Sequence, residues 1–174
     1  MTHQGYISLA ISCGLSVRDA ARFFALVYVT GADASIAGFD AKYFYNFWRP
    51  RTAIPRADLD GNPETDPDAT WTPLISVNHP EYPSGHAFVS NSTINVIARF
   101  FGTSKVTWTL TASKAAAPQL VKTERTYTNL SSVLREVDDA RVWAGLHWRH
   151  SLQAGGEIGR KVAEYVYDNF FRPQ

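Results

Sequence analysis

The stretch Tyr82-Pro83-Ser84-Gly85-His86-Ala87 decides how the rest of this sequence is interpreted. Proline ends the preceding structure, serine is a common helix N-cap, and glycine allows another group to approach the helix start closely. The apolar residues that follow recur at helical spacing and predict a helix from Ser84 to Gly102. Free N–H groups and the positive dipole end make such a helix start favourable for an anion. On its own, the stretch favours an ordinary serine cap followed by a surface histidine, His86.

The composition describes a globular chain that we expect to form one domain over residues 1–174. Hydrophobic residues make up 45% of the 174 residues and charged residues 19%, which is enough for a sizeable core. The net charge of +1 gives no overall basic field for nucleic acid, so an anion site must be local. The lone cysteine, Cys13, excludes an intramolecular disulfide.

The sequence shows neither an obvious membrane span nor a signal peptide. The longest uninterrupted apolar run, residues 23–29, is far below the ~20 residues that a spanning helix needs. The first residues lack a basic segment followed by an apolar one. We therefore expect no membrane span, and the compartment and oligomeric state stay open, with a homo-oligomer as one possibility.

The remaining pattern is mainly helical. Ser16-Val17-Arg18-Asp19 resembles a capping box, and the long helix that it starts is expected to end at Pro50, with Trp48 and Arg49 in its last turn. Residues 51–82 are rich in turn formers and lack periodicity, which indicates a long loop, and its apolar residues predict that it is packed. The other expected elements are a brief helix within residues 1–15, a strand at 107–111, a short helix from Pro118 and a helix at 150–170. A further helix is expected at 131–144, capped by Ser131 or Ser132, with Ala140 and Trp143 facing inward. The fold class is therefore all-α, a helical bundle with one long ordered loop before the central helix.

Two other segments carry cations and a histidine. Lys42 and Arg49 are seven residues apart, so on a helix they would lie on nearly the same face and reach one target. Arg141 and His147 are six apart, about 240° around a helix, and share a site only if the helix breaks, for which Gly145 is the expected place. The simpler interpretation of Lys42 and Arg49 is a solvated charged stripe.

Arg141 and His147 also have simpler interpretations. Arg141 could pair with Asp138 or Asp139, and His147 with His150 could be a surface pair or half of a zinc site. Neither an HExxH motif nor a further cysteine-rich set accompanies the histidines, which speaks against zinc.

In this order, the three segments resemble a known signature. Lys42-x6-Arg49-Pro50, Pro83-Ser84-Gly85-His86 and Arg141-x5-His147 are similar to the motifs shared by vanadate-dependent haloperoxidases and type 2 phosphatidic acid phosphatases. The loop features Asp60-Gly61-Asn62-Pro63 and His79-Pro80-Glu81-Tyr82 resemble the soluble haloperoxidase-like branch.

The resemblance implies a site for a tetrahedral oxyanion. His147 would bond the central atom, as the metal ligand of vanadate in a haloperoxidase, and His86 would be the acid–base residue. The substrates would then be hydrogen peroxide and a halide. In a phosphatase, phosphate would occupy the same site, and His147 would attack the phosphorus of a phosphate ester to form a phosphohistidine. The residues that would hold the oxyanion are Lys42, Arg49, Ser84, Gly85 and Arg141.

The sequence departs from this signature at two positions. Ala140 stands where the phosphatase motif has serine, and Ser151 stands where it has an acid four residues after the histidine. That acid would orient the His147 ring, so a backbone carbonyl, Ser151 or another acid such as Glu157 must do so here.

Three functions therefore remain open. The soluble-branch loop and His79, a position at which histidine resembles bromoperoxidases, favour a haloperoxidase that uses bromide or iodide. His79 could equally be a loop residue bonded to a backbone carbonyl. A soluble acid phosphatase on the same residues is the second hypothesis, and a non-enzymatic binding protein for phosphate or vanadate is the third.

Overall fold

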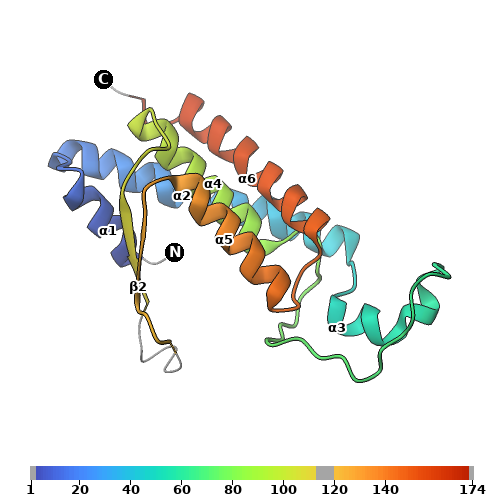
Figure 1. The fold of residues 1–174 in the computed structure, drawn as a ribbon. Helices are drawn as coiled ribbons and strands as arrows, with labels where there is room; N and C mark the ends of the chain where they lie inside the picture. The colour runs from blue at the N-terminus through green and yellow to red at the C-terminus, as the bar shows by residue number, and fades with distance from the viewer. Residues whose placement is uncertain (1–2, 113–119, 173–174) are drawn as a thin grey trace.

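The computed structural model describes residues 3–112 and 120–172 and shows a helical bundle with a small sheet at one end (Figure 1). This confirms the expected all-α class. The short helix expected from Pro118 lies outside the described residues. The elements, in chain order, are α1 (His3–Ser12), α2 (Val17–Tyr45), α3 (Pro50–Ala53), the 3-10 helix η1 (Ile54–Leu59), α4 (Gly85–Phe101), β1 (Trp108–Thr111), β2 (Glu124–Tyr127), α5 (Leu130–Trp143) and α6 (Arg149–Asn169).

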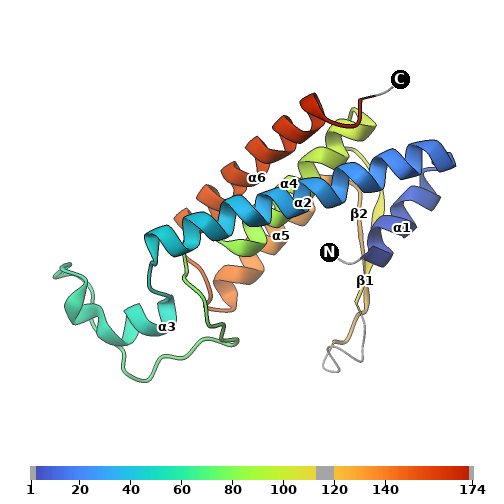
Figure 2. The same cartoon turned by 180° about the vertical axis from the view of Figure 1, so that it is seen from behind.

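Helix α4 lies at the centre of the bundle. It packs against α2, α5 and α6, and Figure 2 shows α2 crossing in front of it. As predicted, it begins after Ser84 and ends at Gly102, whose left-handed φ of 69° stops the helix. The core contains mainly aliphatic and aromatic side chains from α1, α2, α4, α5 and α6, including Leu9, Phe23, Leu26, Val27, Ile94, Val96, Ile97, Val133, Ala163 and Val166.

Glycines allow α6 to approach α4 closely. A Cβ atom at Gly155 would lie 2.7 Å from the carbonyl oxygen of Ser84, and one at Gly159 would lie 2.3 Å from the carbonyl oxygen of Phe88. Both distances are shorter than van der Waals contact, and the obstructing atoms belong to the backbone. The two glycines therefore fix how closely the start of α4 is held against α6.

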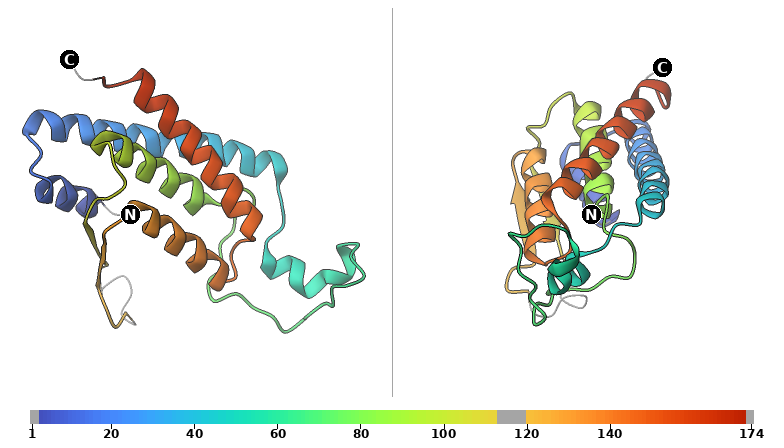
Figure 3. Two further views of the ribbon diagram at one scale, coloured as in Figure 1. Left: turned by 45° about the horizontal axis from the view of Figure 1, so that its top comes forward. Right: turned by 90° about the vertical axis from the view of Figure 1, so that its right-hand side faces the viewer.

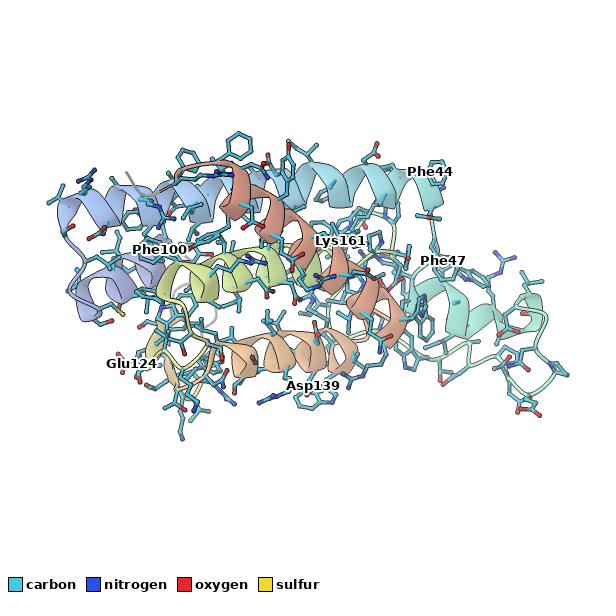
Figure 4. The ribbon with its side chains drawn as sticks, turned by 90° about the horizontal axis from the view of Figure 1, so that it is seen from above. Phe44, Phe47, Phe100, Glu124, Asp139 and Lys161 are labelled. Atoms are coloured by element: carbon cyan, nitrogen blue, oxygen red, sulfur yellow. The ribbon has the colours of Figure 1, made fainter. Side chains whose placement is uncertain are left out.

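The long helix α2 ends earlier than the sequence predicts. It stops at Tyr45 because Asn46 adopts a left-handed conformation, with φ of 44°, and donates its N–H to the carbonyl of Lys42. Asn is one of the few residues that tolerate this conformation. Pro50 begins α3 instead of ending α2, a favoured position for proline. Figure 4 labels Phe44 at the end of α2 and Phe47 on the extended segment that follows.

The expected loop of residues 51–82 is ordered, and it contains short helices that the sequence did not predict. Its first part forms α3 and η1, which project from the end of the bundle (Figure 1). Further on, the ring of Trp71 packs against Gly145, and the N–H of Leu74 bonds the carbonyl of Ala144. The prediction that the loop's apolar residues are packed is wrong for Leu74 and Ile75, which are 82% and 53% exposed.

The strand expected at 107–111 is confirmed as β1, which pairs antiparallel with β2, a strand that the sequence pattern did not reveal. Helix α5 begins one residue early because Asn129, not a serine, caps it by accepting the N–H of Ser131. Trp143 was expected to face inward but is 71% exposed, and Ala140 is exposed too. The last helix is confirmed over nearly its expected range.

The helical stretch Val17–Leu59 is long and apolar enough, by length and composition alone, to cross a membrane. Length and composition alone do not test the expectation of no membrane span, which was drawn from the short uninterrupted run at 23–29. Central helices of globular bundles share this composition, and the inward face of α2 is buried in the core through Phe23 and Leu26.

We predict that Gly159→Ala destabilises the fold by about 1–3 kcal/mol, because its methyl group would overlap the backbone of α4. Gly156→Ala is the matched control, since its Cβ would meet only the end of the Asn91 side chain, at 3.2 Å. Chemical denaturation of the two variants and the parent chain measures the difference. Equal stability of the two variants would contradict the close packing of α4 on α6.

Candidate functional site

The residues singled out from the sequence meet at one end of the bundle. The C-terminal ends of α2 and α5, the N-terminal ends of α4 and α6, and the end of the long loop converge there, as the left view of Figure 3 shows. Because four helix termini meet, backbone groups without intrahelical partners are concentrated at this end.

Lys42, on the last turns of α2, is completely buried. Its ammonium group donates to the carbonyl oxygens of Pro80 and Glu81, both at 2.9 Å. Burial, with a smaller effect from Arg49, lowers the pKa of Lys42 to about 8, while Glu81 opposes the shift. The side chain is therefore still mainly a cation at pH 7, with one of its three donors uncommitted.

Arg49 also reaches the same backbone, but not from the helix face that the sequence spacing predicted. It lies beyond the end of α2, as the residue before α3. Nε donates to the carbonyl of His79 at 2.7 Å, Nη2 to the carbonyl of Pro80 at 3.1 Å, and Nη1 to that of Leu146 at 2.9 Å. Most of the guanidinium fork is thus bound to the protein itself, and the alternative of a solvated stripe is wrong.

A cavity of about 310 Å³ lies beside these cations. It brings together five candidates from three separate segments, together with His79 and with apolar residues such as Phe39 and Val89 on its walls. Lys42 and Ser84 lie behind the wall: a Cβ at Gly85 would be 3.7 Å from Cε of Lys42. The candidates that line the cavity are Arg49, Gly85, His86, Arg141 and His147.

Three polar atoms at this site have no hydrogen-bond partner among the described residues. They are the hydroxyl oxygen of Ser84, which is completely buried, Nε of Arg141 and Oε2 of Glu81. Ser84 does not cap α4 with its side chain, contrary to the usual role of an N-cap serine, and its N–H bonds the carbonyl of Ser151. Buried polar groups without partners are rare and call for an explanation such as a bound ion.

His147 follows the predicted break in the helix. Gly145 has a φ of 72° and separates α5 from α6, so Arg141 and His147 can share the cavity despite their spacing. His147 is only 4% exposed, and Nδ1 of its ring lies 2.7 Å from the Oε1 of Glu81. The same Oε1 accepts the N–H of Trp148 at 3.0 Å.

The sequence did not identify Glu81 as the partner of His147. The suggested alternative, Glu157, instead forms an exposed pair with Lys161 at 3.0 Å. Ser151 lies near the site, where its hydroxyl is 3.4 Å from the carbonyl of Glu81. The available signal was a lone acid between Pro80 and Tyr82, directly before the motif that opens α4.

The simpler interpretations of the other residues are also tested by the contacts. Asp139 pairs with Arg149 at 2.6 Å, and no ion pair of Arg141 is found within the described part of the chain. His150 is exposed and stacks on Tyr82, away from the cavity. Residues 3–112 and 120–172 contain no group of three or more His, Cys, Asp or Glu placed to hold a metal ion, so a zinc site is not supported there.

The histidines of the cavity are held in their neutral forms. His86 lines the cavity but is an exposed residue, and partial desolvation of its ring together with the nearby Arg141 lowers its pKa to about 4. Burial, Lys42 and Arg49 also lower the pKa of His79, whose Nδ1 is 3.1 Å from Nη2 of Arg49. Burial lowers the pKa of His147 as well, although the carboxylate of Glu81 opposes the shift.

The donor set fits a tetrahedral oxyanion such as vanadate or phosphate. An anion in the cavity would find the guanidinium of Arg141, whose Nε has no partner among the described residues, beside the first turn of α4. The positive charge around the cavity fits an anion and not a metal cation held by carboxylates.

Comparisons with known proteins identify the family of the chain. Residues 22–173 match the family model described as VCPO second helical-bundle domain. The vanadium chloroperoxidase of Curvularia inaequalis is 26% identical over a gapped alignment of 182 residues, and the match covers 80% of this chain and 29% of that protein. This chain therefore spans less than a third of that curated relative.

Two solved structures share the fold. The crystal structure of the first bacterial vanadium-dependent iodoperoxidase superposes with a TM-score of 0.77 at 23% identity, covering 97% of this chain and 38% of that one. The holo-type bacterial vanadium-dependent chloroperoxidase gives a TM-score of 0.75 at 20% identity, covering 95% and 40%. The chain belongs to the VCPO second helical-bundle family, within the vanadium haloperoxidase-like superfamily.

The depressed pKa of His86 predicts a pH dependence of stability. The pKa of His86 is 6.5 in the unfolded chain and about 4 in the folded one, so the unfolded state takes up the proton first. The folded state therefore loses stability as the pH falls from 6.5 to 4. We expect the unfolding free energy to fall less steeply in His86→Gln than in the parent chain between pH 6.5 and 4. Parallel curves for the two proteins would show that His86 is not held neutral.

Proposed function

We propose that this chain carries the oxyanion site of a vanadate-dependent haloperoxidase, which oxidises a halide with hydrogen peroxide at a vanadate held by His147. The observation that carries the proposal is the buried histidine whose Nδ1 is fixed by Glu81, in a cavity shared with two arginines and a neutral histidine. The family assignment supports the same chemistry. Residues 1–174 would act in this as one helical domain.

The protein's own residues would have distinct roles. With Nδ1 donating to Glu81, the Nε2 lone pair of His147 is free to bond the central atom of the oxyanion. Arg141 would donate through its unpartnered Nε, and Ser84 through its unpartnered hydroxyl. Lys42 would add positive charge from behind the cavity wall, and Arg49 would add it on the wall itself through its remaining N–H. The Gly85 N–H would donate from the helix start.

When bound, vanadate supplies the Lewis acid that activates hydrogen peroxide toward a halide. His86 is neutral in the free site, so it can accept a proton from incoming peroxide and return it as hypohalous acid is released. His79 lines the same cavity, and a neutral imidazole there offers an N–H toward a halide, which supports bromide or iodide as the substrate.

The direct test is halide oxidation by the purified chain with vanadate, hydrogen peroxide and iodide, bromide or chloride, followed by halogenation of phenol red or a dimedone-type acceptor. We expect turnover that depends on added vanadate, and loss of at least a hundredfold in His147→Ala because the central atom loses its nitrogen ligand. His150→Ala is the matched control, since His150 is three residues away and stacks on Tyr82 outside the cavity. Absence of turnover with all three halides would contradict the proposal.

A soluble acid phosphatase remains the alternative, and one observation favours it. A histidine that donates Nδ1–H to a carboxylate is also arranged as a nucleophile, whose Nε2 could attack phosphorus while the departing alkoxide takes a proton from His86, which is protonated at acid pH. Hydrolysis of a simple phosphomonoester in vanadate-free buffer, inhibited by vanadate, would support this function. A phosphohistidine on His147, detected by mass spectrometry, would identify the intermediate. Absence of hydrolysis would exclude the phosphatase function.

A further inference from the structure

Glu81 occupies a position that packing alone does not explain. Its side chain is completely buried, and Oε1 lies 2.7 Å from Nδ1 of His147 and accepts the N–H of Trp148 at 3.0 Å. Oε2 is buried too and has no hydrogen-bond partner among the described residues. Burying a carboxylate with one oxygen unsatisfied carries a large desolvation cost, so an uncharged residue would be less costly there.

The backbone of Glu81 belongs to the same network. Its carbonyl oxygen accepts the ammonium group of Lys42 at 2.9 Å, and its N–H bonds the carbonyl of Phe47 at 2.9 Å. The N–H and the carbonyl group of Glu81 are therefore both fixed by hydrogen bonds. The backbone conformation that they hold limits the directions in which the side chain can point. One residue thus sets the position of a buried cation and of a buried histidine relative to each other.

Ser151 explains why the carboxylate can come from this side. The residue is completely buried, its hydroxyl lies 3.4 Å from the carbonyl of Glu81, and its own carbonyl accepts the N–H of Ser84. A carboxylate at 151, four residues after His147, would be buried beside the backbone carbonyl of Glu81, which is itself an acceptor. A second buried negative charge at the same site would repel the carboxylate of Glu81, so the two positions are alternatives.

We propose that Glu81 is the positioning carboxylate of His147: it keeps the proton on Nδ1 and so holds the Nε2 lone pair ready for the oxyanion. The inference rests on the proposed function for what Nε2 then does, but the tautomer itself is a property of the free protein. The carboxylate is supplied by the residue three positions before Ser84 at the opening of α4, not by the start of α6.

The test uses two substitutions with different losses. Glu81→Gln keeps an oxygen for Nδ1–H and Trp148 N–H but removes the charge, whereas Glu81→Leu removes the acceptor altogether. Nitrogen-15 NMR of histidine-labelled protein without oxyanion reports the tautomer of His147. We expect the Nδ1–H form in the parent chain and in Glu81→Gln, and a mixture of tautomers in Glu81→Leu.

Vanadate affinity, measured by equilibrium dialysis with elemental analysis, is the second readout. Loss of a carboxylate on a ligand histidine typically costs about 10–100-fold in affinity, and we expect a loss of this size in Glu81→Leu and a smaller one in Glu81→Gln. Glu157→Gln is the control, because this acid pairs only with Lys161 at the surface of α6. Circular dichroism establishes that each variant is folded. If Glu81→Leu does not fold, Glu81→Gln alone decides, through its lowered affinity at an unchanged tautomer.

The outcomes separate this inference from the proposed function. If either Glu81 variant that folds keeps both the parent tautomer and the parent affinity, the positioning role is wrong even though halide oxidation may stand. If the parent chain neither binds vanadate nor oxidises halides but Glu81→Leu changes the His147 tautomer, the proposed function fails and the positioning role holds. A parent chain with the proton on Nε2 would overturn the inference directly.

Discussion

Burial of two cations against the backbone carbonyls of residues 79–81 is the constraint on which the site depends. Lys42 and Arg49 come from either side of the end of α2, and between them they donate to all three carbonyls of this segment. An unpaired buried charge costs several kcal/mol, and these carbonyls together with Glu81 offset much of that cost. The end of the long loop is consequently held in one conformation, and the start of α4 follows directly from it.

The same segment connects the site to the rest of the bundle. Glu81 reaches across to His147 at the turn between α5 and α6, and Ser84 bonds the backbone of Ser151 on α6. Gly155 and Gly159 let α6 lie close enough for these bonds to form. The cavity is therefore bounded by four helix termini whose relative positions are fixed by hydrogen bonds, as a preorganised anion site requires.

Much of the fold followed from the sequence, because helix starts and stops have local chemical causes. The boundaries of α4 and α6 and the break at Gly145 were predicted from caps, periodicity and glycine. The end of α2 was not predicted, because Asn46 can adopt several backbone conformations and the sequence does not show that it adopts the left-handed one. The predicted convergence of Lys42 and Arg49 is found, but Arg49 reaches the site from an extended segment and spends most of its donors on the protein.

The partner of His147 lay beyond sequence reasoning for a different reason. Glu81 and His147 are 66 residues apart, and only the tertiary fold brings the carboxylate to the ring. Spacing rules apply within one helix or turn, so they pointed to Ser151 and Glu157 on the same helix. The unpartnered hydroxyl of Ser84 is likewise visible only once its surroundings are known.

The proposed binding of a tetrahedral oxyanion in this cavity through His147 is tested most directly by a crystal structure of the chain soaked with vanadate. We expect vanadium bonded to Nε2 of His147, with its oxygens within hydrogen-bond distance of Arg141 and Ser84. Vanadium bound elsewhere, or a cavity that stays without the anion at saturating vanadate, would contradict the account.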